Sequence, residues 1–334
     1  MTQHCFIIAE AGVNHNGDPG LAERLIDAAA EAGADAVKFQ TFRAEQLAAS
    51  DLATAAYQRE KSGENVQQAM LARLELDEPT HHRLRDHAVR RNIEFLSTPF
   101  DLPSIELLQR LDIRRFKISS GQITDIPCLQ RIGKTGKPVI LSTGMATLGE
   151  VEQAINILTR AGTQRETITL LHATTAYPAP KDQVNLRAMQ TLGRAFNLAY
   201  GYSDHTEGIE VAIAAVSLGA SVIEKHLTLD RSLSGPDHEA SLEPREFATM
   251  IRAIRNVERA LGSALKNPVP AEQTVAPLVR KRIVAAAPIR KGDFFNETNL
   301  TTRRAPRGTC ASLWEHVMGR RATRDYDTGE GIEP

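Results

Sequence analysis

Two lysines stand at the ends of predicted strands and could hold an anion. Lys38 lies in Val37-Lys-Phe-Gln-Thr41, and Lys117 opens Lys117-Ile-Ser-Ser-Gly121, where hydroxyls and amides follow directly. Val139-Ile-Leu-Ser-Thr-Gly-Met145 places further hydroxyls after another strand. Cations, hydroxyls and N–H donors in a concave site are what a phosphate requires. Each loop alone could equally be a common turn, but two lysines favour an anion site because an unpaired ammonium is costly to desolvate.

Two histidines are candidates for metal ligands. His205 and His226 end the seventh and eighth predicted strands, so their rings could meet one divalent ion. Two neutral imidazoles with substrate and water oxygens suit Mn²⁺ or a similar ion. Their spacing is not a recognised signature, so the residues alone favour histidines that only form hydrogen bonds. His172 stays open between core and pocket lining, and three more are expected on the surface: His81, His82 and His87.

The elements that must position these residues follow a repeated pattern of a short apolar run and a longer helical run. The predicted strands are Phe6–Glu10, Ala36–Gln40, Glu94–Thr98, Arg115–Ser119, Val139–Ser142, Ile168–His172, Leu198–Tyr202 and Val222–His226. The predicted helices include Leu21–Ala32, Val66–Leu74, Thr80–Arg91, Ile105–Leu111, Glu150–Ala161, Leu186–Ala195, Ile209–Leu218 and Arg245–Leu261. Such alternation predicts a parallel sheet with right-handed crossovers, and eight cycles favour a closed (β/α)₈ barrel.

In such a barrel, ligands bind at the carboxyl ends of the strands. The polar residues there are Glu10, Lys38, Gln40, Thr98, Lys117, Ser119, Ser120, Ser142, Thr143, His172, Ser203, His205, Glu224 and His226. Side chains alternate across a strand, so Glu224 and His226 share one face and Lys225 points the other way. The pattern therefore predicts a polar active site in the barrel mouth.

The chain divides into a barrel over residues 1–262, a Pro-rich linker over 263–277 and a tail over 278–334. The tail holds 11 Lys/Arg against 7 Asp/Glu and has no predicted long helix. A segment of this size is marginal for independent stability and is expected to pack on something else.

The bulk composition excludes several classes of protein. A formal charge of −1 favours neither nucleic acid nor an anionic membrane as a partner. No run approaches the roughly 20 apolar residues of a membrane helix. The three cysteines have no disulfide, metal or redox spacing, which is typical of reduced thiols in a cytoplasmic protein.

Nine motifs, in order, carry a resemblance to a known family. They are Ile8-Ala-Glu-Ala-Gly-Val-Asn-His-Asn-Gly17, Val37-Lys-Phe-Gln-Thr41, Phe95-Leu-Ser-Thr-Pro-Phe100, Phe116-Lys-Ile-Ser-Ser-Gly121, Leu141-Ser-Thr-Gly-Met145, Tyr177-Pro-Ala-Pro180, Gly201-Tyr-Ser-Asp-His-Thr206, Glu224-Lys-His226 and Gly235-Pro-Asp-His238. With them the chain resembles sialic acid synthases, a family that includes N-acetylneuraminate and legionaminate synthases. Its tail, from Ile283 to Arg304, resembles the antifreeze-protein-like (SAF-type) domain of that family.

The resemblance implies an enzyme that condenses phosphoenolpyruvate (PEP) with an N-acetylated amino-sugar aldehyde and releases phosphate by C–O cleavage. By position, the implied PEP-binding residues are Lys38, Thr98, Lys117, Ser120, Ser142 and Ser203. The implied sugar-side residues are Gln40, Tyr177 and Asp237. Glu10 and Glu224 match the acidic residues near the reacting carbons. His205 and His226 match the metal ligands, with Mn²⁺ expected and Mg²⁺ or Co²⁺ as alternatives.

The resemblance also implies a quaternary structure. Arg304 matches an arginine that the tail domain inserts into the partner subunit's barrel, near the acyl group of the sugar. This implies a domain-swapped homodimer and agrees with a tail too small to stand alone.

Two departures from the family pattern bear on the sugar, and a third affects the shape of the loop after Arg304. Thr175 stands where N-acetylneuraminate synthases carry an asparagine that contacts the sugar, and Gln122 replaces a usual glutamate. Ala305-Pro-Arg-Gly308 departs from the usual loop after the inserted arginine. The smaller Thr175 favours 2,4-diacetamido-2,4,6-trideoxymannose, the substrate of a legionaminate synthase.

Other substrates and another class of protein stay open as alternatives. N-acetylmannosamine, the substrate of an N-acetylneuraminate synthase, is the first. A sugar phosphate is disfavoured because there is no extra basic cluster. A non-catalytic carbohydrate-binding protein of capsule or coat assembly is disfavoured too, since it needs neither a metal nor two phosphate-binding lysines.

Overall fold

The computed structural model describes residues 4–54, 59 and 63–333 of the chain. It separates into two compact units, Met1–Gly262 and Ser263–Pro334, and each is described by itself. Within the described ranges, no helix is long and apolar enough to cross a membrane.

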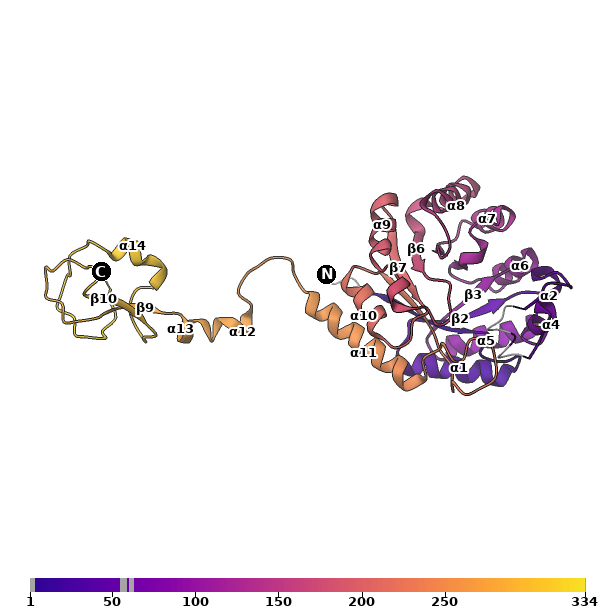
Figure 1. Cartoon of the computed structure of the whole chain (residues 1–334), viewed down its shortest axis with the longest axis horizontal. Coiled ribbons are helices and arrows are strands. Elements are labelled where there is room, and N and C mark those ends of the chain that lie inside the picture. The colour runs from indigo at the N-terminus through magenta and orange to yellow at the C-terminus, as the bar shows by residue number, and fades with distance from the viewer. Residues whose placement is uncertain (1–3, 55–58, 60–62, 334) are drawn as a thin grey trace. The chain divides into compact units, whose positions relative to one another are not determined.

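The first unit is built on eight parallel strands (Figure 1). They are β1 Phe6–Gly12, β2 Ala36–Thr41, β3 Glu94–Pro99, β4 Phe116–Ile118, β5 Val139–Ser142, β6 Ile168–Ala173, β7 Ala199–Asp204 and β8 Val222–His226. Their order is β3-β2-β1-β8-β7-β6-β5-β4, and the two end strands, β3 and β4, contact each other. The sheet therefore curls into a nearly closed barrel, and the predicted (β/α)₈ fold is confirmed.

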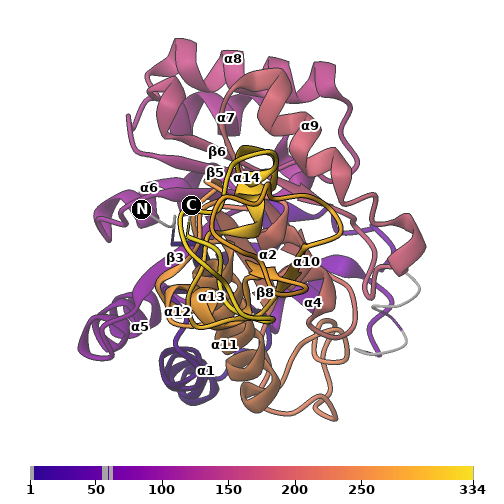
Figure 2. The same ribbon diagram turned by 90° about the vertical axis from the view of Figure 1, so that its left-hand side faces the viewer.

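Helices surround the strands on the outside of the barrel (Figure 2). They are α1 Pro19–Ala32, α5 Glu78–Arg90, α6 Leu102–Arg110, α7 Ile126–Gly133, α8 Leu148–Ala161, α9 Arg187–Phe196, α10 Glu210–Ser217 and α11 Pro244–Leu261. Two short helices, α2 Ala44–Leu47 and α4 Gln67–Ala72, lie in the long excursion after β2. Single turns of 3₁₀ helix occur at Ser120–Gln122, Arg165–Thr167 and Lys181–Gln183.

Local sequence explains where the barrel helices start. Four of them begin with an aspartate whose carboxylate accepts a hydrogen bond from a backbone N–H of the first turn, followed by a proline in that turn. These caps are Asp18, Asp77, Asp101 and Asp125. Asp caps the free N–H groups of the first turn, and proline is tolerated there because its missing N–H has no helical partner. Of these four helices, α6 closely follows its strand, whereas α5 begins only after the long excursion that follows β2.

Alternation along the strands produces two apolar layers. One layer packs between strands and helices and includes Ile7, Val37, Phe95, Tyr202 and Ile223. The other fills the barrel interior with Ile8, Ala36, Leu96, Ile140, Leu171 and Val222. The interior positions nearer the carboxyl ends of the strands are polar, so this inner apolar layer forms the floor of a site.

The second unit has a small core of its own. It contains α12 Pro270–Gln273, α13 Ala276–Val279, the antiparallel pair β9 Arg282–Ala285 and β10 Leu300–Arg303, and α14 Trp314–Val317. Its core is formed by Ile283, Ala285, Ile289, Phe295, Leu300, Val317, Ala322, Tyr326 and Ile332. The antifreeze-protein-like assignment of this unit stays a prediction.

Some sequence predictions need correction. His81 is buried rather than on the surface, since its Nδ1 donates to the Asp77 carbonyl (2.9 Å) and its Nε2 lies 2.8 Å from Thr41 Oγ1. His87 is only partly exposed, because it pairs with Asp27 at 2.7 Å. Helix α7 was absent from the predicted elements, and the predicted linker contains the short helix α12. Part of the excursion after β2, residues 55–58 and 60–62, lies outside the described residues.

Gly201, in β7, has no room for a side chain. An added Cβ would overlap the carbonyl oxygen of Val222 on β8 and lie 2.9 Å from Leu171 Cδ2. We expect Gly201→Ala to lower the free energy of unfolding by about 1–3 kcal/mol, measured by urea denaturation. Gly149→Ala is the control, because the nearest atom to its Cβ would be 4.0 Å away in the first turn of α8. Wild-type stability of the Gly201 variant would contradict this strand packing.

Candidate active site

A cavity of about 310 Å³ opens at the carboxyl ends of the barrel strands. Its lining includes all the predicted site residues of the barrel: Glu10, Lys38, Gln40, Thr98, Lys117, Ser120, Ser142, Thr175, Tyr177, Ser203, His205, Glu224, His226 and Asp237. Arg304, the remaining predicted site residue, is exposed just after β10 in the second unit. The structure thus brings residues from all eight strands or the loops after them to one site.

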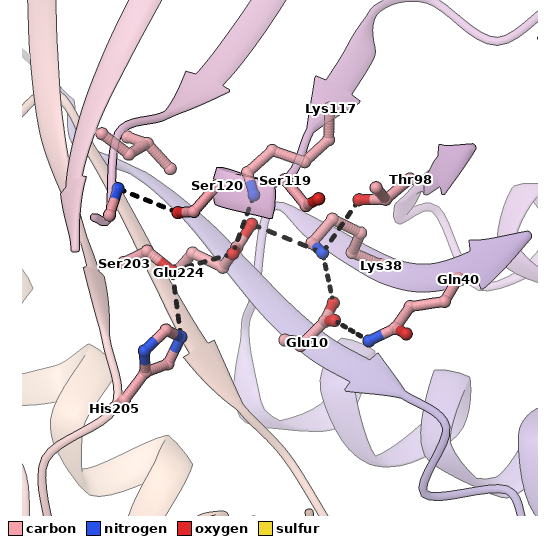
Figure 3. Close-up of polar contacts among 12 residues, drawn as sticks. Glu10, Lys38, Gln40, Thr98, Lys117, Ser119, Ser120, Ser203, His205 and Glu224 are labelled. Carbon is pink, nitrogen blue, oxygen red and sulfur yellow. Dashed lines mark hydrogen bonds and ion pairs between the residues drawn. The ribbon is translucent and has the colours of Figure 1, made fainter. Parts of the chain in front are cut away.

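The centre of the cavity is a charge cluster of Glu10, Lys38, Lys117 and Glu224 (Figure 3). Lys38 Nζ lies 2.8 Å from Glu10 Oε2 and 3.7 Å from Glu224 Oε2. Lys117 Nζ lies 3.1 Å from Glu224 Oε1. All four side chains are buried, so the carboxylates and ammonium groups compensate one another's charge.

The surroundings of the cluster shift the pKa values of the two glutamates in opposite directions. Burial raises the pKa of Glu10, and the Lys38 ammonium offsets only part of that effect. Burial would also raise the pKa of Glu224, but Lys117, Lys38 and a hydrogen bond from Ser203 together lower it to about 2. Burial lowers the pKa of Lys117, with Glu224 opposing. A pair of carboxyls with opposite shifts is the arrangement that acid–base chemistry uses.

Hydroxyls and amides surround the charge cluster. Lys38 Nζ donates to Thr98 Oγ1 (3.3 Å), and Ser203 Oγ donates to Glu224 Oε1 (2.9 Å). The backbone N–H of Gly144 donates to Ser120 Oγ at 2.9 Å, which joins the loops after β4 and β5. Ser142 Oγ is buried and has no hydrogen-bond partner among the described residues. Such an orphaned hydroxyl is expected where a polar ligand binds.

Two histidines form the other wall of the cavity. The rings of His205 and His226 lie 5.6 Å apart between centroids, and Tyr177 packs against His205 at 4.2 Å. His205 Nδ1 donates to the Thr174 carbonyl at 2.7 Å, which leaves the lone pair on Nε2. His226 Nδ1 is buried without a hydrogen bond and lies 3.9 Å from Asp237 Oδ2. His205 Nε2 has a long contact of 3.5 Å with Ser203 Oγ, so of these two histidines only His226 has a buried ring nitrogen without a hydrogen bond.

The histidine pair fits a divalent cation whose other ligands come from outside the chain. Burial lowers the pKa of His205, and burial together with His205 lowers that of His226 further, so both rings are the neutral form that binds metals. Within the described ranges, no three His, Cys, Asp or Glu residues are grouped to hold a metal. Water or substrate oxygens would have to complete the coordination.

The loop that carries Asp237 is tied to the loop after β1. Asn16 Nδ2 donates to the Ser234 carbonyl (2.9 Å), and Asn14 Nδ2 donates to Ser241 Oγ (2.9 Å). Ser241 Oγ in turn donates to the Asp237 carbonyl at 2.7 Å. The two loops thus form one wall beside His226.

Four cavity residues were not assigned a site role from the sequence: Phe100, Ser119, Gly121 and Met145. All four lie within a few residues of a strand end, and Ser119 was noted as a strand-end residue. Met145 has a φ of 65° and is 72% exposed. A bulky residue in this left-handed region is strained, and such strain is typical of functional sites.

Three other residues noted in the sequence do not line the cavity. Gln122 is buried behind it and donates to the Pro99 carbonyl at 2.6 Å, which joins the end of β3 to the loop after β4. Thr143 donates to the Leu171 carbonyl at 3.0 Å. His172 Nε2 lies 2.7 Å from the Val184 carbonyl, so this histidine has a structural contact.

Comparison with known proteins assigns the family. A family model described as the NeuB family matches residues 25–266. A Campylobacter jejuni protein named N,N'-diacetyllegionaminic acid synthase is 51% identical over 327 residues, 98% of each chain. The chain belongs to the NeuB family.

Other relatives extend this assignment to structure. A Legionella pneumophila protein, also named N,N'-diacetyllegionaminic acid synthase, is 45% identical and covers 97% of this chain and 92% of its own length. The crystal structure of an N-acetylneuraminic acid synthetase from Leptospira borgpetersenii matches with a TM-score of 0.72 at 36% identity, covering 82% of this chain and 90% of that one. The resemblance to sialic acid synthases that the motifs carry is thus confirmed at the level of the family.

His15, in the loop after β1, makes stability depend on pH. It is fully buried, and burial, with a smaller effect of His81, lowers its pKa to about 4. The unfolded chain takes up this proton near pH 6.5, so stability falls as the pH drops from about 6.5 to 4. His15→Asn removes the titrating group and retains an acceptor for the Gly17 N–H. Between pH 6.5 and 4, we expect the free energy of unfolding of wild type to fall by about 3 kcal/mol more than that of this variant.

Urea denaturation at several pH values measures this difference. His82→Gln is the matched control, because that side chain is 45% exposed, and it should follow wild type. Parallel curves for wild type and His15→Asn would contradict the burial of a neutral His15.

Proposed function

We propose that this NeuB protein is a nonulosonic (sialic-acid-type) acid synthase, which condenses PEP with an N-acetylated mannosamine-type aldehyde and releases phosphate. The observation that carries the proposal is the charge cluster beside two neutral histidines in one cavity. Ammonium groups serve an anionic substrate, and carboxylates serve proton transfer.

The PEP side of the cavity is assigned to the strands that carry the lysines. Lys38 and Lys117 would bind the phosphate, and their present partners Glu10 and Glu224 show that both ammonium groups face the cavity. The hydroxyl groups assigned to PEP are Thr98, Ser120, Ser142 and Ser203. The orphaned Ser142 Oγ gains a partner when a phosphate or carboxylate oxygen enters.

The sugar side is assigned to Gln40, Thr175, Tyr177, Asp237 and Arg304. His205 and His226 would hold a divalent cation, Mn²⁺ with Mg²⁺ or Co²⁺ as alternatives. When bound, that cation supplies Lewis-acid polarisation of the sugar aldehyde. Tyr177 keeps both imidazoles oriented, because its ring packs on His205 at an interplanar angle of 35° and meets His226 edge-on.

The chain's own groups can then support the bond changes. PEP C3 forms a bond to the aldehyde carbon, the aldehyde C=O π electrons move to its oxygen, which takes up a proton, and positive charge develops at C2. Glu224, which the lysines keep ionised, stabilises that charge by its carboxylate. Water adds at C2, and Glu10 or Glu224 accepts its proton. The C2–O bond to phosphate breaks as the new C2 hydroxyl gives up its proton and becomes the keto group, and the two lysines hold the phosphate as it leaves.

The favoured sugar is 2,4-diacetamido-2,4,6-trideoxymannose. Two relatives named N,N'-diacetyllegionaminic acid synthase are 51% and 45% identical, against 36% for the Leptospira N-acetylneuraminic acid synthetase. Thr175 lines the cavity next to Gly144 and presents a short side chain toward the substrate space. The alternative is N-acetylmannosamine, as used by an N-acetylneuraminate synthase.

A phosphate-release assay with PEP, Mn²⁺ and a panel of acetamido sugars tests this proposal. We expect phosphate release only when a sugar is present, fastest with 2,4-diacetamido-2,4,6-trideoxymannose. If no sugar releases phosphate, the enzymatic function is wrong and a carbohydrate-binding role gains support. If N-acetylmannosamine is far better, the reaction stands and the choice of sugar is wrong.

We also propose a cytoplasmic domain-swapped homodimer. The three cysteines, Cys5, Cys128 and Cys310, are free thiols, as in a reducing compartment. Arg304 would enter the barrel of the other subunit and contact the acyl group of the sugar. The second unit has its own small core, which is consistent with a module that packs on another surface.

Arg304→Ala should raise the KM for the sugar by at least tenfold, as expected when a charged hydrogen bond is lost, while the Mn²⁺ affinity stays that of wild type. Arg303→Ala is the matched control, because this neighbouring arginine is also exposed at the end of β10. Loss of Mn²⁺ binding in the Arg304 variant would mean that its role is misassigned.

The swap itself is tested by co-expressing Arg304→Ala with Lys117→Met. A swapped dimer pairs the intact barrel of the first variant with the intact Arg304 of the second, so activity should return. No recovery in purified mixed dimers would contradict the swap.

A further inference from the structure

A second buried ion pair lies behind the two cavity histidines, on the outer side of the barrel wall. Asp204 of β7 and Lys225 of β8 are paired in register, and Lys225 Nζ lies 2.8 Å from Asp204 Oδ2. Both side chains are 0% exposed. Neither residue lines the cavity, so the pair cannot contact a substrate there.

Strand alternation links this pair to the histidines. Asp204 directly precedes His205, and Lys225 directly precedes His226, so the ion pair faces the helices while both imidazoles face the cavity. Tyr202 and Ile223, two residues earlier on the same outer face, belong to the apolar layer. Apolar side chains can therefore pack on this outer face of β7 and β8. At the positions of Asp204 and Lys225 they would also avoid the desolvation cost of an ion pair.

The pair also holds the residue after His205. Asp204 Oδ1 accepts hydrogen bonds from Thr206 N (2.9 Å) and from Thr206 Oγ1 (2.7 Å). Lys225 Nζ donates to the Thr206 carbonyl at 2.8 Å. The backbone on both sides of His205 is thereby tied to the strand that carries His226.

We propose that the Asp204–Lys225 pair is a positioning device that sets the separation of His205 and His226 as ligands of one divalent cation. The inference rests on the proposed function, because it takes these histidines to be the cation site. Groups behind metal ligands typically change metal affinity by about 10- to 100-fold when they are removed. The two lysines of the charge cluster lie on β2 and β4, but Ser203 and Glu224 adjoin the pair on β7 and β8. The readout of this proposal is therefore Mn²⁺ binding and not PEP binding.

Mn²⁺ binding, followed by the EPR signal of free Mn²⁺ in the absence of substrates, tests the positioning role. We expect Asp204→Asn to weaken Mn²⁺ binding by about 10- to 100-fold. Thr206→Val, which keeps the ion pair and removes one hydrogen bond, should weaken it by a smaller factor. Arg255→Met is the matched control, because it removes another ion pair of the barrel, with Asp35 at 2.8 Å, and should leave Mn²⁺ binding unchanged.

The double variant Asp204→Leu/Lys225→Met separates positioning from stability. Replacing both charges by apolar groups is often neutral for folding, so its thermal unfolding should resemble that of wild type. If its Mn²⁺ affinity stays weak, the positioning role is supported. If stability and Mn²⁺ affinity both match wild type, or if Asp204→Asn binds Mn²⁺ like wild type, the proposal is overturned.

A histidine variant shows whether a negative result rules out the positioning role alone or the proposed cation site as well. His226→Ala should abolish Mn²⁺ binding. If wild type binds no Mn²⁺, or if His226→Ala binds it equally well, the cation site is wrong and the positioning role is wrong with it. If the histidine variant loses Mn²⁺ while the Asp204 and Thr206 variants do not, the positioning role alone is wrong.

Discussion

Four buried charges in the barrel mouth determine what this protein can bind. Lys117 comes from β4 and Glu224 from β8, strands that are not neighbours in the sheet, so their 3.1 Å contact spans the barrel interior. The contact requires the sheet to curl into a barrel, and an apolar layer lies beneath it. Removing one charge would leave a buried partner uncompensated, which costs about 3–5 kcal/mol. The fold and the anion site are therefore coupled through this cluster.

The same cluster explains how one cavity can serve two kinds of chemistry. Under the proposed function, an incoming phosphate would offer Lys38 and Lys117 new negative partners, which would make the glutamates available to act on the substrate. The histidine wall on β7 and β8 is electrically different, since burial keeps both rings neutral. The anionic and the carbonyl-bearing substrates can therefore be assigned to separate walls of the cavity.

Much of this architecture could be predicted from the sequence because it depends on local periodicity. Strand positions follow from apolar runs such as Val139–Ser142, and the strand-end rule identified Lys38 and Glu224 before any contact was known. Burial of His81 could not be predicted, since it depends on Thr41, which is distant along the chain. The Asp204–Lys225 pair was missed for the same reason: alternation showed that Lys225 faces outward but not what it meets there.

The most direct test of the central claim is a crystal structure of the protein with PEP and Mn²⁺. The account predicts that the PEP phosphate lies within ion-pair distance of both Lys38 Nζ and Lys117 Nζ, and that Mn²⁺ contacts His205 and His226. PEP bound elsewhere, with the charge cluster still closed on itself at 2.8 Å and 3.1 Å, would contradict the account.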